Sequence, residues 1–86
     1  MGNAMDDMAK ALCEIILGKI RGSISTYSVD DDLYVDIAQD SFKFHFTCYK
    51  FTEEASEKGV QPIADKILGA YRKYILNRYF QQQRTA

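Results

Sequence analysis

The side chains best suited to act as nucleophiles or bases are one histidine, His45, and two cysteines, Cys13 and Cys48. Nucleophilic catalysis usually needs a base beside the nucleophile, and a structural zinc site needs about four thiolate or imidazole ligands. The alternation of apolar and polar residues around His45 places it on the opposite strand face from Cys48. We therefore predict no catalytic residue, no metal site and no cofactor, and we expect both cysteines to be reduced core thiols.

The carboxylates and glycines also lack a catalytic or nucleotide-binding pattern. Asp30–Asp32 lacks the ligand spacing of a calcium loop, which favours a solvated hairpin turn. Glu53 and Glu54 are adjacent on a predicted surface segment and are typical of helix-start charges. No phosphate-binding glycine loop occurs in the sequence, and the scattered glycines fit helix ends and close packing: Gly18, Gly22, Gly59 and Gly69. We predict that the chain is not an enzyme.

Helical periodicity begins near the N-terminus, where apolar residues recur every three or four positions from residue 6 to about Ile20. Gly22 is the expected stop signal. We interpret residues 1–5 as a leader outside the domain, with Met5 as the candidate native start.

Three segments that follow have strand character. Residues 41–51 alternate strictly, with Phe42, Phe44, Phe46 and Cys48 on one face. Residues 33–37 place Leu33, Val35 and Ile37 on one face, and the short connection 38–41 predicts an antiparallel hairpin. Residues 23–29 are rich in β-formers but have a mixed pattern, which favours an edge strand.

A final amphipathic helix is expected from Pro62 to about Phe80, with an apolar stripe formed by Ile63, Ile67, Ala70, Tyr71 and Tyr74. Residues 52–59 fit either one short helical turn or a loop. Residues 81–86 are polar and are predicted to be a frayed tail. One domain therefore spans residues 6–80.

Together these elements predict an α+β fold, a two-layer sandwich in the order helix, strand, strand, strand, helix. Both helices must bury their stripes against the apolar face of a three-stranded antiparallel sheet. We expect the sheet side of the core to pack against Leu12, Ile16, Ile63, Ile67 and Tyr74.

Charge is distributed unevenly along the chain. Residues 1–42 contain three basic and eight acidic residues, whereas five basic and no acidic residues occur from Lys66 onward. The longest strongly apolar run, residues 15–17, is far shorter than the roughly 20 residues that cross a bilayer. No cleaved leader pattern opens the chain, so we predict a cytoplasmic protein without membrane association.

Two surfaces are candidate contact sites. At about 100° per residue, Leu76, Tyr79 and Phe80 face away from the stripe of the last helix, with Arg72 and Arg78 nearby. We predict that this interface mediates self-association or binding of another protein. The second surface is an aromatic patch on the solvent face of the sheet, formed by Tyr34, His45 and Tyr49, with Tyr27 as a further candidate member.

The order helix, three antiparallel strands, helix is similar to that of the double-stranded RNA-binding domain. In that family the last helix opens with a lysine cluster that contacts phosphates, whereas residues 61–66 read Gln-Pro-Ile-Ala-Asp-Lys, with a single lysine. The resemblance makes nucleic-acid binding the alternative function, though not the favoured one. Its contacts would come from the basic residues of the last helix: Lys66, Arg72, Lys73, Arg78 and Arg84.

Overall fold

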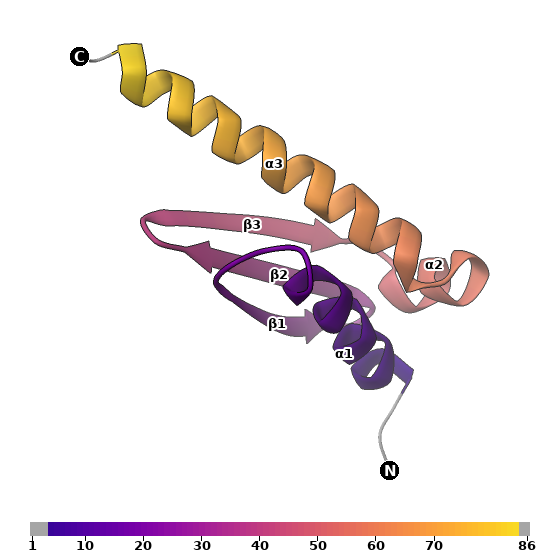
Figure 1. Cartoon of the computed structure of the whole chain (residues 1–86). Helices are drawn as coiled ribbons and strands as arrows, with labels where there is room; N and C mark the ends of the chain where they lie inside the picture. Colours follow the sequence, from indigo (N-terminus) through magenta and orange to yellow (C-terminus); the bar gives the residue numbers. More distant parts are fainter. Residues whose placement is uncertain (1–3, 85–86) are drawn as a thin grey trace.

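The computed structural model describes residues 4–84, which form three helices and one sheet (Figure 1). Residues 1–3 of the predicted leader and residues 85–86 of the predicted tail lie outside this description. The elements in chain order are α1 (Ala4–Leu17), β1 (Ser23–Val29), β2 (Asp32–Gln39), β3 (Phe42–Cys48), α2 (Phe51–Lys58) and α3 (Val60–Arg84).

The sheet is antiparallel in the order β1-β2-β3, so β1 is an edge strand as predicted and β3 forms the other edge. The predicted hairpin joins β2 to β3 through a tight turn at Asp40 and Ser41. On the central strand, Leu33, Val35 and Ile37 are buried and the side chains between them face outward. The sheet therefore has one apolar face, which the helices must cover.

Helices α1 and α3 pack together against this face, which confirms the predicted α+β two-layer architecture (Figure 1). Leu12 and Ile16 of α1 and Ile63 and Ile67 of α3 are buried, as predicted. By contrast, Tyr74 and the predicted sheet residues Phe42, Phe44 and Phe46 are only half-buried, because β3 lies at the edge of the sheet.

The segment after β3 differs from the sequence prediction. The strand ends at Cys48, and Phe51 begins a third helix, α2. Of the two alternatives predicted for residues 52–59, the helical one is therefore correct, and the helix is longer than the single turn expected. Lys50 has a left-handed backbone (φ 51°), which redirects the chain between the two elements. This reversal turns Phe51 inward, where it is fully buried and is the largest such side chain in the core.

The turn between β1 and β2 holds the start of α2. The carbonyl oxygen of Asp31 accepts a hydrogen bond from the backbone N–H of Phe51 at 2.7 Å. The Asp31 carboxylate accepts from the backbone N–H of Thr52 at 3.2 Å and from the Thr52 hydroxyl, and the Asp32 carboxylate accepts from the backbone N–H of Lys50 at 3.1 Å. The acidic run predicted as a solvated turn is therefore partly a structural contact.

Two helix ends also differ from prediction. Helix α1 ends at Leu17, before the predicted Ile20, because the poor helix former Gly18 interrupts the pattern ahead of Gly22. Helix α3 continues to Arg84, past the predicted end at Phe80, so residues 81–84 are helical.

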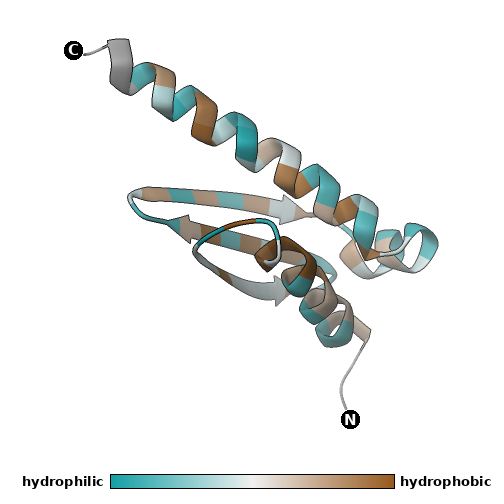
Figure 2. Cartoon of the chain, viewed as in Figure 1, coloured by the Kyte–Doolittle hydropathy of each residue, from teal (hydrophilic) through white to brown (hydrophobic). Residues whose placement is uncertain are grey.

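Toward its C-terminal end α3 inclines away from the sheet, so its last turns stand clear of the other elements (Figure 1). Its last buried residue is Tyr71, whose hydroxyl donates to Oε1 of Gln39 at 3.0 Å. Apolar residues nevertheless continue along this part of α3 (Figure 2). None of the helices within residues 4–84 combines the length and apolar character needed to cross a membrane.

Candidate interaction surface

The predicted interface on α3 is exposed. Leu76, Tyr79 and Phe80 show 53%, 51% and 56% of their surface to solvent, and we call these three residues the α3 apolar band. The rings of Tyr79 and Phe80 contact each other edge to face, with centroids 5.9 Å apart.

The band faces away from the protein core. At about 100° per residue, the buried α3 residues, which run from Ile63 to Tyr71, occupy an arc of about 140°. Leu76 and Phe80 lie nearly opposite the centre of that arc, and Tyr79 lies at its far edge. The core of this chain therefore cannot bury Leu76 and Phe80.

The basic residues of α3 are not gathered on one side. Arg72 lies on the same face as the apolar band, whereas Arg78 lies about 100° from Tyr79, within the angular range of the buried arc. Lys73 borders the band, and Lys66 points toward a pocket beside β3. Arg84 is a helical position at the end of α3. Two of the five predicted nucleic-acid contacts, Arg72 and Arg78, therefore lie away from the side of α3 that Lys66, Lys73 and helical position 84 share.

The residues of the predicted sheet-face patch do not share one cross-strand row, since Tyr34 is opposite Thr47 whereas His45 is opposite Asp36. Tyr27 and Tyr34 are directly opposite each other and stack, with ring centroids 4.8 Å apart and planes 9° from parallel. His45 pairs with Asp36 on the neighbouring strand through Nδ1 and Oδ1. Tyr49 lies beyond the end of β3 and is highly exposed. These contacts are ordinary cross-strand pairs.

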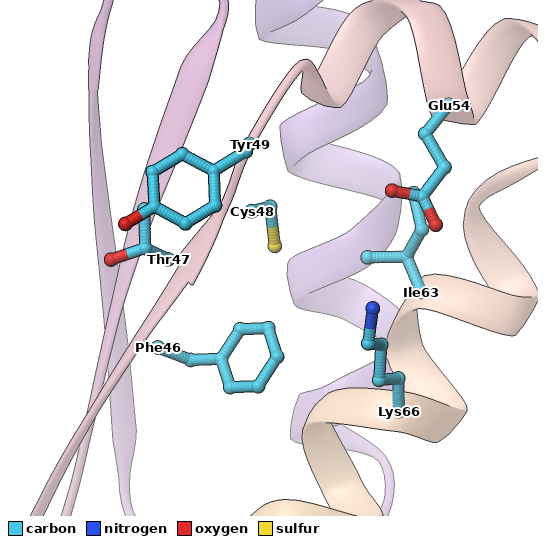
Figure 3. A pocket seen from close by; sticks show the side chains of 7 residues that line it. All are labelled: Phe46, Thr47, Cys48, Tyr49, Glu54, Ile63 and Lys66. Carbon is cyan, nitrogen blue, oxygen red and sulfur yellow. The ribbon is translucent and has the colours of Figure 1, made fainter.

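A small pocket of about 180 Å³ lies between β3 and the helices α2 and α3 (Figure 3). Phe46, Cys48 and Ile63 form its apolar wall, and Glu54 and Lys66 approach it from α2 and α3. Burial, together with the nearby Glu54 carboxylate, raises the pKa of the Cys48 thiol to about 11, and Lys66 opposes this effect. Cys48 is therefore a protonated thiol near neutral pH and a poor nucleophile.

The other titratable groups are not assembled into a reactive centre. Burial raises the pKa of the half-buried Cys13 thiol despite its hydrogen bond with Thr26. His45 is on the exposed face of the sheet, whereas Cys48 is buried beneath it. Among residues 4–84, no group of three or more His, Cys, Asp or Glu side chains is placed to hold a metal ion. As predicted, Glu53 and Glu54 lie in the first turn of α2.

Gly69 is also exposed on α3, and the sequence analysis did not name it as a contact residue. It lies inside the helix, and apart from its chain neighbours and the nearby backbone of α3 no atom of the described residues lies within 4 Å of the position a Cβ would take there. Close packing within the chain, which the sequence analysis expected for this glycine, is therefore not found. The sequence does offer one indication that this position is unusual: a glycine inside a helix destabilises that helix by about 1 kcal/mol relative to alanine.

Comparisons of this chain with protein-family models, with curated proteins and with solved structures found no match.

Proposed function

We propose that this chain is a non-enzymatic protein–protein interaction domain that self-associates through the α3 apolar band. The observation that carries the proposal is that Leu76, Tyr79 and Phe80 are all more than half exposed, on a part of α3 that stands clear of the sheet. Contiguous exposed apolar residues are uncommon on monomeric proteins, and aromatic residues with a neighbouring arginine are enriched in interfaces.

A second copy of the chain is the occupant that the charges favour. Each copy has a basic C-terminal region without acidic residues after Asp65 and an N-terminal half with an excess of five acidic residues. Two such copies attract each other when the basic end of one approaches acidic groups of the other. Free thiols at Cys13 and Cys48 fit a reducing compartment, and we place the association in the cytoplasm.

Nucleic-acid binding receives less support from the geometry. Arg72 and Arg78 lie on other sides of α3 than Lys66 and Lys73, and the net charge of −1 gives no long-range attraction to phosphate. The aromatic side chains of the sheet face pair with each other or lie beside Asp36, which repels phosphate. We therefore retain nucleic-acid binding only as the outcome that would replace the proposal.

Sedimentation equilibrium on the parent chain and on the double variant Leu76→Ser, Phe80→Ser tests the proposal. We expect a concentration-dependent dimer for the parent and a monomer for the variant. Leu17→Ser with Tyr27→Ser is the matched control, since it removes an exposed leucine and an exposed aromatic residue elsewhere. A parent that stays monomeric at millimolar concentration, and binds duplex RNA or DNA with a steep salt dependence, would establish the alternative.

A further inference from the structure

The pocket between β3, α2 and α3 combines an apolar wall with two opposite charges (Figure 3). In its wall of Phe46, Cys48 and Ile63, the side chains of Cys48 and Ile63 are only 5% and 2% exposed. Its volume of about 180 Å³ is slightly larger than the roughly 150 Å³ of an engineered apolar protein cavity that binds benzene. The pocket is therefore large enough for an apolar group of about the size of a leucine or phenylalanine side chain.

Glu54 and Lys66 reach this pocket from different helices. Glu54 lies in the first turn of α2, and Lys66 lies in the second turn of α3 with its ammonium group pointing into the pocket (Figure 3). Besides burial, which raises the pKa of the Cys48 thiol most, Glu54 raises that pKa and Lys66 lowers it, so both charges act on the same wall. The two side chains form no ion pair with each other. Each can therefore pair with a charged group of a ligand.

The negative side of the pocket continues along α2. A second hollow shares Tyr49 and Glu54 with the pocket. It is lined by three carboxylates and one ammonium group: Glu53, Glu54, Glu57 and Lys50. The excess of carboxylates makes the α2 side attractive to a cation, whereas Lys66 makes the α3 side attractive to an anion. A ligand that carries both charges would thus be held in one orientation.

We propose that this pocket binds a free α-amino acid with an apolar side chain, such as leucine or phenylalanine. The side chain lies against Phe46 and Ile63, the α-ammonium group pairs with Glu54, and the α-carboxylate pairs with Lys66. A free amino acid carries both charges on one carbon beside an apolar group, whereas a residue within a peptide has lost both charges to amide bonds. The inference goes beyond the proposed function, because no residue of the α3 apolar band lines the pocket.

Titration of the isotope-labelled chain with L-leucine, followed through the NMR shifts of its amides, tests the proposal. We expect shifts confined to residues 46–49, to α2 and to the first two turns of α3, with a dissociation constant of about 1 mM or lower. Isoamylamine is leucine without the carboxylate, and isocaproate is leucine without the ammonium group. Each should bind about threefold to tenfold more weakly than leucine, because one charge of the pocket then has no partner.

Two variants assign the charges to residues. Lys66→Met retains an apolar stem without the charge, so it should lose the preference for leucine over isoamylamine. Glu54→Gln should lose the preference for leucine over isocaproate. Lys73→Met is the matched control, since Lys73 lies two turns from Lys66 on nearly the same side of α3, and it should keep both preferences.

Three results would overturn the proposal. The first is the absence of pocket shifts at about 20 mM leucine, about twenty times the expected dissociation constant. The second is equal binding of leucine, isoamylamine and isocaproate by the parent, which would show an apolar pocket without charge recognition. The third is a set of shifts centred on the α3 apolar band. Sedimentation of the parent and of Leu76→Ser with Phe80→Ser tests the proposed function separately, so either idea can fail while the other stands.

Discussion

The Asp31 carboxylate accepts hydrogen bonds from both the backbone N–H and the hydroxyl of Thr52 and so joins the β1–β2 turn to the first turn of α2. The two residues are 21 positions apart in the sequence. This contact satisfies a backbone donor at the start of α2, which has no side-chain cap of its own.

The contact between Asp31 and Thr52 should make stability depend on pH. The hydrogen bond from the Thr52 hydroxyl holds the pKa of Asp31 below its ordinary value. Its stabilisation is therefore complete above the pKa of an unfolded aspartate and is lost as the pH falls through the lower pKa of the folded chain. Asp31→Asn should lower the melting temperature near pH 7 and flatten its decrease in acid. Thermal melts from about pH 6 to pH 2 measure this.

Asp30→Asn is the control for the Asp31 variant. Asp30 is exposed in the same turn and has a left-handed backbone that asparagine tolerates. The control should retain the acid dependence of the parent. If Asp31→Asn and Asp30→Asn give the same pH profile, the Asp31–Thr52 contact does not contribute to stability in acid.

Phe51 should be more important for stability than Phe44. Phe51 is fully buried, whereas Phe44 lies on an edge strand and is half-buried against Tyr71 and Tyr74. Phe51→Ala should reduce the free energy of unfolding by about 3 to 5 kcal/mol, a large part of the stability of a domain this small. Phe44→Ala should reduce it by less. Urea titrations of both variants compare them, and a greater loss for Phe44→Ala would be evidence against this core.

Gly22→Ala should destabilise the chain. Gly22 has φ 139°, and a Cβ there would collide with the carbonyl oxygen of Ala38 on β2. We expect a loss of more than about 1 kcal/mol in the free energy of unfolding. Thermal or urea unfolding measures the loss. An unchanged stability would mean that the chain takes another path between α1 and β1.

The two thiols should differ in reactivity. Cys48 is buried with a pKa of about 11, and Cys13 is half-buried with a raised pKa. Near pH 8 a maleimide or disulfide reagent should label Cys13 slowly and Cys48 only when the chain unfolds. Labelling followed by mass spectrometry, with Cys13→Ser and Cys48→Ser as single-thiol controls, measures each rate. Rapid labelling of Cys48 in native buffer would contradict its burial.

Local patterns were sufficient to predict most of this fold. The alternation around Leu33, Val35 and Ile37 and the helical spacing of Leu12 and Ile16 each follow from one face being buried. The prediction extended the strand to Phe51, which the alternation places on the polar face with Lys43 and His45. The true position of Phe51 depends on the left-handed backbone of Lys50 and on a contact with Asp31, about 20 residues away. Such long-range contacts leave no periodic signal in the sequence.

The candidate surface was likewise predicted in part. Leu76, Tyr79 and Phe80 were identified because helix geometry alone places them off the apolar stripe. Arg78 was grouped with them from its nearness in sequence, although the helix turns it toward a different side. The sequence did not show that Gly69 faces open space, since a glycine in a helix is equally compatible with internal close packing.

The inclination of α3 away from the sheet divides this helix into two parts that depend on different forces. The part that packs on the core is stabilised by tertiary contacts. The turns after Ile75 are helical only because they continue that part, since an isolated segment of about nine residues is too short to form a helix in water. Amide protons should therefore exchange faster with each turn toward Arg84. A bound partner would slow that exchange from the free end inward, so ordering this end is part of the free energy that any partner must supply.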